Sequence, residues 1–149
     1  MMQNTFNQIE IKEVDFVSTA LAQSQFARLT FTDTLQPIAI VDVGHLTTSV
    51  AISKGEGLLM LSSFSLGGGH ITADLMQVNG FTYHEADLIK RKVCLTIQTK
   101  KDEKYVVYDN GKPIKALINI TNDVVGARIE NIANVVNKIL SSNEMFKGI

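Results

Sequence analysis

An acidic loop followed by two threonines is the part of this sequence best suited to do chemistry. Residues 42–48 read DVGHLTT and directly follow an apolar run, residues 38–41. A carboxylate at the end of a buried strand can hold a hydrated divalent cation, while hydroxyl groups and backbone amides meet phosphate oxygens. The same pattern also fits an ordinary hairpin turn in which Gly44 supplies a positive φ. The loop alone therefore leaves a phosphate site and a simple turn open.

Three consecutive glycines, residues 67–69, form a second segment suited to phosphate. They follow a β-rich run and immediately precede a segment with helical periodicity. Glycines let the backbone approach a ligand closely, and the start of a helix attracts anions. A glycine run by itself is equally typical of a flexible hinge. Two such loops around one set of strands are a stronger signal than either loop alone.

The remaining reactive side chains have simpler explanations. His70 stands at an expected helix start and could bond an anion, although a capping or solvent-facing role is the commoner one. His84 is expected at the surface, and Cys94, in an apolar run, is expected in the core. One cysteine and three scattered histidines offer neither a disulfide framework nor the spacing of a metal site. We therefore expect no structural zinc.

The segments around these loops alternate between strand and helix patterns. The continuous apolar run at 38–41 indicates a central strand buried on both faces. Thr82 lies three residues before Glu85, the spacing of a capping box at a helix start. Gly80 is expected to end the helix before it, and residues 109–111, which read DNG, are expected to form a turn. The expected strands are 9–12, 38–41, 49–53, 58–64, 93–99, 105–108 and 114–120, and the expected helices are 17–24, 71–78, 82–91 and 123–140.

The last expected helix is amphipathic. Its apolar side chains repeat at intervals of four and three residues over a polar opposite face, and they are Val125, Ile129, Ile132, Val136 and Ile139. We expect this stripe to be buried against a small sheet. An asparagine stripe, Asn131, Asn134 and Asn137, also follows helical spacing and suits either a plain exposed face or a polar partner surface.

Size and charge limit the possible functions. The chain has 149 residues, 14 basic and 15 acidic side chains and a net charge of -1. This length allows one compact domain with a real core but not two complete lobes. Nucleic acid is not expected as the main partner, because phosphate backbones are bound by clustered Lys and Arg. No apolar run approaches the roughly 20 residues of a membrane span, so we expect a soluble, cytoplasmic chain without direct membrane contact.

Residues 38–92 resemble the second phosphate segment of the actin-like ATPases and, among them, the bacterial cell-division protein FtsA. The shared pattern is D-[IV]-G-x-x-T-T, a strand-turn-strand, G-G-x-x-[IL]-T-x-D and then A-E-x-x-K, and a looser likeness covers residues 9–140. The resemblance implies an α/β, actin-like or ribonuclease-H-like fold: a mixed sheet with flanking helices and a small inserted α/β subdomain. Residues 1–92 would be part of subdomain IIA, and residues 93–149 a IIB-like insertion ending in a long helix. We expect a piece of the second lobe of such a protein.

The resemblance also implies residues that contact ATP and Mg²⁺. Asp42 would act on the metal or its waters. The other implied contacts are Gly44, Thr47 and Thr48 at the terminal phosphates, Gly67 and Gly68 near the phosphates and ribose, and Asp87 and Lys90 near the ribose and adenine. The chain departs from the family pattern at His45 and Leu46, where small residues are usual, at Ser49, where an acid is usual, and at Asp87, where glutamate is usual.

Three functions from different classes follow. The first is an FtsA-type scaffold that binds ATP between two lobes, forms filaments and links FtsZ at the septum to the inner face of the membrane through segments or partners outside this chain. The second is a nucleotide-free interaction module of the same fold, such as a PilM-like pilus-assembly scaffold. The third is a true ATPase or phosphotransferase, for which this chain lacks a complete catalytic set, so that we expect no hydrolysis.

The family likeness also predicts a protein-binding surface on the last helix. The partner would be the acidic and apolar C-terminal peptide of FtsZ, which suits a surface with basic and amide side chains. The residues expected to face it are Arg128, Asn131, Asn134 and Lys138.

Overall fold

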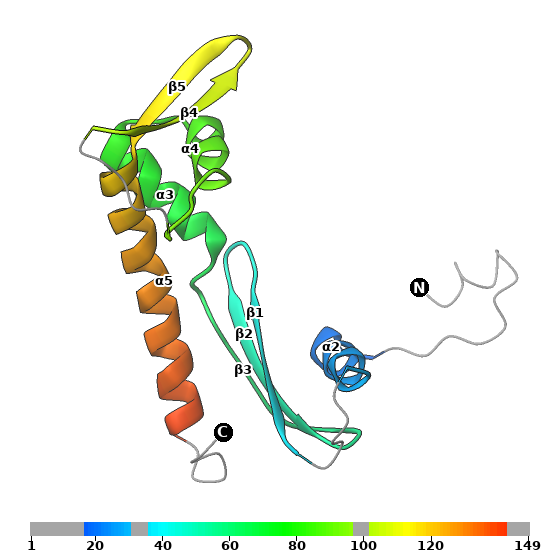
Figure 1. The fold of residues 1–149 in the computed structure, drawn as a ribbon. Coiled ribbons are helices and arrows are strands. Elements are labelled where there is room, and N and C mark those ends of the chain that lie inside the picture. The colour runs from blue at the N-terminus through cyan, green and yellow to red at the C-terminus, as the bar shows by residue number, and fades with distance from the viewer. Residues whose placement is uncertain (1–16, 31–35, 97–101, 143–149) are drawn as a thin grey trace, which may run out of the picture. The chain divides into compact units, whose positions relative to one another are not determined.

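A computed structural model describes residues 17–30, 36–96 and 102–142 (Figure 1). The elements follow the order α2 (Thr19–Arg28), β1 (Ile38–Val43), β2 (Thr48–Lys54), β3 (Gly57–Phe64), α3 (Gly68–Asn79), α4 (Tyr83–Lys90), β4 (Lys104–Asp109), β5 (Lys112–Leu117) and α5 (Ile118–Ser141). This is the expected mixture of strands and helices. The strand predicted at residues 9–12 lies outside the described residues.

The chain forms two compact units, one within Met1–Ile40 and Ala51–Leu61 and the other within Val41–Val50 and Ser62–Ile149. In the first unit, the guanidinium group of Arg28 connects α2 to β2 through hydrogen bonds. Arg28 is 8% exposed, and its Nη2 donates a hydrogen bond of 2.7 Å to the carbonyl of Ser53. Ser18 caps the start of α2 by accepting a bond from the amide of Leu21. The helix predicted at 17–24 therefore forms and runs one turn further.

Strands β1, β2 and β3 form a sheet in that order, so β2 is its middle strand. Val50 and Ile52 in β2 are completely buried, whereas Val41 and Val43 in β1 are 42% and 51% exposed. Within residues 36–96, β1 is therefore an edge strand, and the prediction that residues 38–41 form a central strand is wrong there. An apolar run indicates a strand, but its neighbours on each side decide how deeply it is buried.

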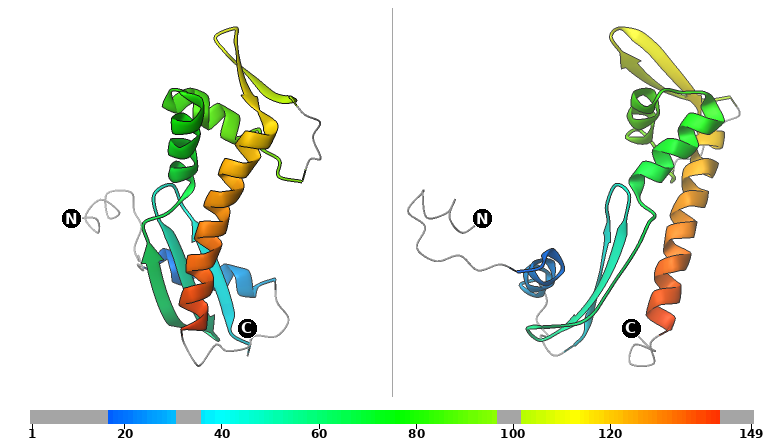
Figure 2. Two further views of the ribbon diagram at one scale, coloured as in Figure 1. Left: turned by 90° about the vertical axis from the view of Figure 1, so that its left-hand side faces the viewer. Right: turned by 180° about the vertical axis from the view of Figure 1, so that it is seen from behind.

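The core of the second unit joins α3, α4, the β4–β5 hairpin and the first turns of α5, which lie beside one another in both views of Figure 2. Its buried side chains are Leu75, Ala86, Ile89, Tyr105, Val107, Ile114, Ala116, Ile118 and Val125. The local signals for the two helices are confirmed. Thr82 and Glu85 form the predicted capping box of α4, and Gly80, with a φ of 68°, ends α3.

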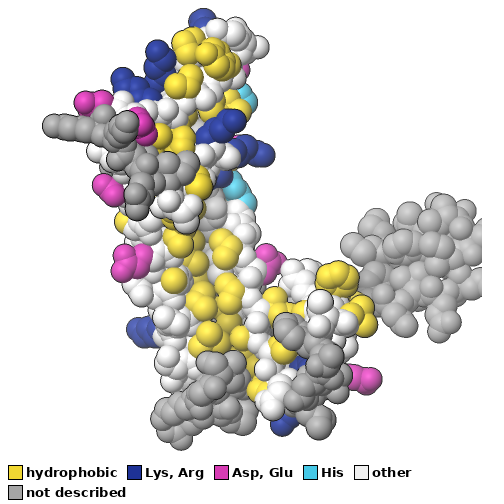
Figure 3. Space-filling view, in the orientation of Figure 1, with side chains coloured by type: hydrophobic (Ala, Val, Ile, Leu, Met, Phe, Trp, Pro, Cys, Tyr) yellow, Lys and Arg dark blue, Asp and Glu magenta, His cyan; other side chains and the backbone are white. Residues whose placement is uncertain are grey.

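The β4–β5 hairpin has one buried and one exposed face. Its antiparallel register pairs Tyr105 with Ala116 and Val107 with Ile114, and these four side chains all pack into the core. Asn110 and Gly111 supply the positive φ values of the predicted turn, 47° and 78°. The opposite face is exposed and mixed in character, and Figure 3 shows both hydrophobic and basic side chains in its upper part.

Two predicted strands are wrong in part. Residues 93–96 form no strand, because the amide of Val93 bonds to the carbonyl of Lys90 and the amide of Cys94 to the hydroxyl of Tyr105. Cys94 is partly buried rather than a full core residue. The strand expected at 114–120 ends at Leu117, and α5 begins at Ile118, whose amide donates to the carbonyl of Glu103 at 3.0 Å.

Helix α5 buries its apolar stripe unevenly. Val125 and Ile132 are 4% and 7% exposed, but Ile129 is 43% exposed, so the prediction that it is buried is wrong. Helices α3 and α4 share one core with the β4–β5 hairpin. The subdomain boundary expected at residue 92 lies between α4 and β4. No helix in the described ranges has the length and apolar character needed to cross a membrane.

Candidate functional site

The acidic loop and the glycine run expected to form one site are in direct contact. Both lie in the second unit. The amide of Gly68 donates to the carbonyl of Gly44 at 2.9 Å, and the amide of Gly69 donates to the carbonyl of His45 at 2.7 Å. The tip of the β1–β2 hairpin is thus bonded to the first turn of α3. We call this arrangement the loop–α3 junction, residues 42–48 and 67–70.

Most donors of the junction already have acceptors within the chain. The amide of Gly44 bonds to the carbonyl of Thr47 at 2.9 Å. The amide of Gly67 donates to Nδ1 of His70 at 3.1 Å, so His70 has the capping role considered above. Thr48 is completely buried and donates its hydroxyl to the carbonyl of Leu66 at 2.6 Å. Together with the bonds of Gly68 and Gly69, the bond of Gly67 satisfies amides that a helix start normally leaves without a partner.

The two remaining predicted ligands, Asp87 and Lys90, lie on helix α4, and Lys90 contacts the loop–α3 junction. Lys90 Nζ lies 2.8 Å from Oδ1 of Asp87 and donates to Thr72 Oγ1 at 2.8 Å and to the carbonyl of Gly68 at 3.3 Å. Asp87 also pairs with Arg91 at 2.8 Å. Lys90 therefore ties α4 to the beginning of α3. The hydrogen bonds from Lys90 and then Arg91 lower the pKa of Asp87 to about 2.

This lowered pKa predicts a change in acid stability. A carboxylate whose folded pKa lies below its ordinary value of 3.8 stabilises the fold above that value, and its contribution is lost as the pH falls through about 2. We expect the unfolding free energy of the wild type to fall between pH 4 and 2 by about 1 kcal/mol more than that of Asp87→Asn. Urea unfolding at a series of pH values measures this difference. An equal decrease in the unfolding free energy of the two proteins between pH 4 and 2 would contradict the assigned ion pairs.

The junction can meet a phosphate group only at its exposed tip. Asp42 and Thr47 are exposed, whereas Thr48 and Gly67 are buried. No group of three or more His, Cys, Asp or Glu side chains suitable for a metal occurs among the residues that the structure describes. Mg²⁺ usually keeps several waters and binds one or two carboxylates together with substrate phosphates. Asp42 fits that role, and the residues of the tip fit a phosphate with its hydrated cation.

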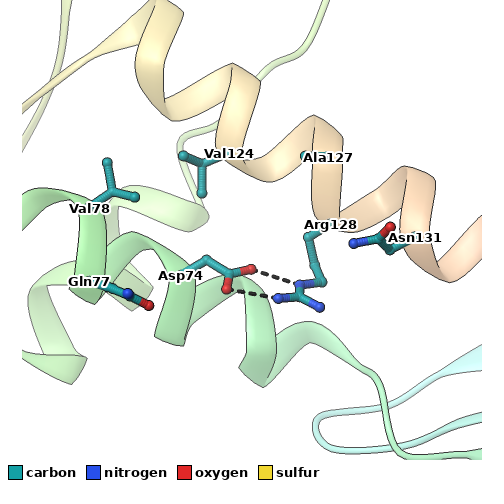
Figure 4. Close-up of a pocket in the computed structure, with 7 residues that line it drawn as sticks. All are labelled: Asp74, Gln77, Val78, Val124, Ala127, Arg128 and Asn131. Atoms are coloured by element: carbon teal, nitrogen blue, oxygen red, sulfur yellow. Dashed lines mark hydrogen bonds and ion pairs between the residues drawn. The ribbon is translucent and has the colours of Figure 1, made fainter.

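The residues predicted to bind a partner lie along α5, and one of them is already paired. Arg128 forms a two-pronged ion pair with Asp74 of α3, through bonds of 2.7 and 2.9 Å, and Figure 4 shows the two side chains meeting between the helices. This pair raises the pKa of Arg128. Asn131 lines the adjoining hollow of about 350 Å³, and Asn134 and Lys138 are exposed further along the helix.

The Asp74–Arg128 pair could not be predicted from the sequence, because the two residues are 54 positions apart and Asp74 stands out only as part of the T-x-D pattern. The same holds for Tyr83, whose hydroxyl lies 3.3 Å from Nε2 of His45 in the loop. Only the fold brings these side chains together.

Comparison with known proteins identifies the family. Residues 39–147 match the family model described as cell division protein FtsA. The chain belongs to the FtsA family. No match was found among curated protein sequences.

Solved structures show the fold of this FtsA-family chain. MreB 5 of Spiroplasma citri bound to AMPPNP is 16% identical with a TM-score of 0.72, and the same protein bound to ADP is 17% identical with a TM-score of 0.73. Each match covers 99% of this chain but only 48% of the MreB 5 chain. The predicted actin-like α/β fold is therefore confirmed, and the chain spans about half the length of these relatives.

Proposed function

We propose that this FtsA-family chain is the second-lobe part of a cell-division scaffold. The scaffold binds ATP with Mg²⁺ between two lobes, assembles into filaments and links FtsZ to the inner face of the cell membrane. The observation that carries the proposal is the direct bonding of the acidic loop to the first turn of α3. A two-lobed site requires each lobe to present such a phosphate loop at the cleft.

The predicted nucleotide ligands have distinct roles in this proposal. Asp42 holds the waters of the cation, and Thr47 meets a terminal phosphate at the exposed tip. Lys90 holds α4 against the start of α3, and Asp87 holds the ammonium group of Lys90 in place, so that together they position the side of the site next to the ribose and adenine. Bound ATP supplies the phosphates that join the two lobes. We propose no hydrolysis by this chain alone, because half a cleft leaves water around the phosphates and stabilises the transition state poorly.

The related structures support nucleotide binding. MreB 5 of Spiroplasma citri is bound to AMPPNP in one of them and to ADP in the other. Self-association into filaments rests on the family likeness. For the FtsZ link, we propose that the acidic C-terminal peptide of FtsZ lies along α5, where Asn134 and Lys138 are exposed. Arg128 contributes less than expected from the sequence, because Asp74 already neutralises it.

Calorimetric titration of the chain with Mg-ATP tests the nucleotide part of the proposal. We expect weak binding by the wild type and an affinity at least about tenfold lower for Asp42→Ala, since a hydrogen bond to a charged group contributes about 1.5–3 kcal/mol. Asp123→Ala, which removes an exposed carboxylate from α5, is the matched control and should bind like the wild type. Equal affinities of Asp42→Ala and the wild type would contradict the role of Asp42.

One observation favours a second function, a nucleotide-free scaffold of the same fold. The amides of Gly67, Gly68 and Gly69 are all bonded within the chain, so the junction is held together without a ligand. In this alternative, the motif serves only to join β1, β2 and α3, and the protein acts through its protein-binding surfaces. The same titration decides: this function predicts no Mg-ATP binding by the wild type or by any variant.

A further inference from the structure

We propose that His45 is a gate at the loop–α3 junction, and that its ring must move aside before a phosphate group can bind at the exposed tip of the loop, beside the first turn of α3. This inference rests on the proposed nucleotide site and names the residue that limits access to it. The gate is formed by His45 of the loop, Gly69 of α3 and Tyr83 of α4. All three residues belong to the second unit.

The first observation is the close approach of His45 to Gly69. A Cβ atom placed on Gly69 would lie 2.7 Å from Cε1 and 2.8 Å from Nε2 of the His45 ring. Real side chains do not approach so closely, so the ring lies over the bare backbone of Gly69 in space that only glycine leaves open. The carbonyl of His45 accepts the amide of Gly69 at 2.7 Å. Residue 45 thus covers the start of α3 with both its backbone and its side chain.

The second observation is the contact that holds the ring in place. Nε2 of His45 lies 3.3 Å from the hydroxyl of Tyr83, and the two rings meet edge to face, with centroids 6.3 Å apart and planes at 73°. Tyr83 is the first residue of α4 and is 49% exposed. The His45 ring therefore bridges the beginnings of two helices. Because both side chains are exposed, the ring can leave this position without unpacking the core.

A single hydrogen bond and one ring contact hold the gate, so opening it costs little. Net contributions of about 0.5–1.5 kcal/mol per hydrogen bond correspond to a closed state favoured by about two- to tenfold. A ligand that binds only the open state has its apparent affinity reduced by the open fraction. His45 therefore lowers the apparent affinity for Mg-ATP without abolishing binding. A smaller residue at position 45 should restore the affinity of the open state.

The test compares Mg-ATP affinities of three variants of the full chain by calorimetry. His45→Ala should bind about tenfold more tightly than the wild type, and Tyr83→Phe, which keeps the ring but removes its hydroxyl partner, about threefold more tightly. His84→Ala is the matched control. It removes the neighbouring histidine, which pairs with Asp109 instead, and should leave the affinity unchanged. Circular dichroism of each variant confirms that it is folded.

A second readout does not depend on affinity. In the wild type, the NMR signals of the His45 and Tyr83 rings should shift on addition of Mg-ATP, whereas those of the His84 ring should not. If the wild type binds Mg-ATP and His45→Ala binds it with equal or lower affinity, the gate is wrong but the proposed function still stands. Absence of binding by the wild type and by His45→Ala would overturn both.

Discussion

Gly67→Ala is expected to lower the free energy of unfolding by about 3 kcal/mol, one of the two largest effects that we predict for a single substitution. A Cβ at this position would lie 2.5 Å from the carbonyl oxygen of Gly44, 2.7 Å from that of His45 and 2.8 Å from the carbonyl carbon of His45. All three atoms belong to the backbone, so no side chain can turn away to make room. The loop must separate from α3, and the bonds of the junction are lost with it. Urea unfolding followed by circular dichroism measures the change.

The backbone of Gly67 is extended, with a φ of -166°, so the expected effect is steric and not conformational. Gly126→Ala is the matched control. Nothing lies within 4 Å of a Cβ at Gly126, and the residue is inside α5. Alanine there should raise the stability by about 0.5–1 kcal/mol through helix propensity. A Gly67→Ala protein as stable as the wild type would mean that the loop does not lie against α3.

Leu75→Ala should lower the free energy of unfolding by about 2–5 kcal/mol. Leu75 is completely buried in the core shared by α3, α4 and the β4–β5 hairpin, and its removal leaves a cavity that the surrounding elements cannot fill. The same unfolding experiment measures the loss.

Val78, which is 51% exposed on the same helix, provides the comparison. Val78→Ala removes a smaller, half-exposed side chain and should change the stability by less than about 0.5 kcal/mol. If Leu75→Ala and Val78→Ala had equal effects, α3 would not belong to this core.

The features that could be predicted from the sequence are those set by neighbouring residues. Thr82 and Glu85 are three positions apart, and the capping box they predicted is present. Asn110 and Gly111 tolerate positive φ values, and the predicted turn lies between β4 and β5. The positions of the acidic loop and the glycine run around one set of strands likewise indicated that the two lie close together, and they are in contact, because short connections keep sequential strands and helices adjacent.

The features that could not be predicted depend on residues far apart in the chain. The alternating residues 118–120 favoured a strand, but the carbonyl of Glu103 receives the amide of Ile118 and starts a helix there. Arg128 looked like a surface cation until the fold placed Asp74 beside it. The contact between His45 and Tyr83 could not be predicted either. The resemblance to the family pattern singled out His45 as bulky, but only the fold shows that its ring meets Tyr83.

We propose that the loop–α3 junction is the phosphate-binding half of a nucleotide site. The most direct measurement is a titration of the ¹⁵N-labelled chain with Mg-ATP, followed by amide NMR signals, which detect weak binding residue by residue. We expect the signals of residues 42–48 and 67–70 to shift most and to saturate together. Shifts confined to α5 or to the β4–β5 hairpin, or no shifts at millimolar Mg-ATP, would contradict this proposal.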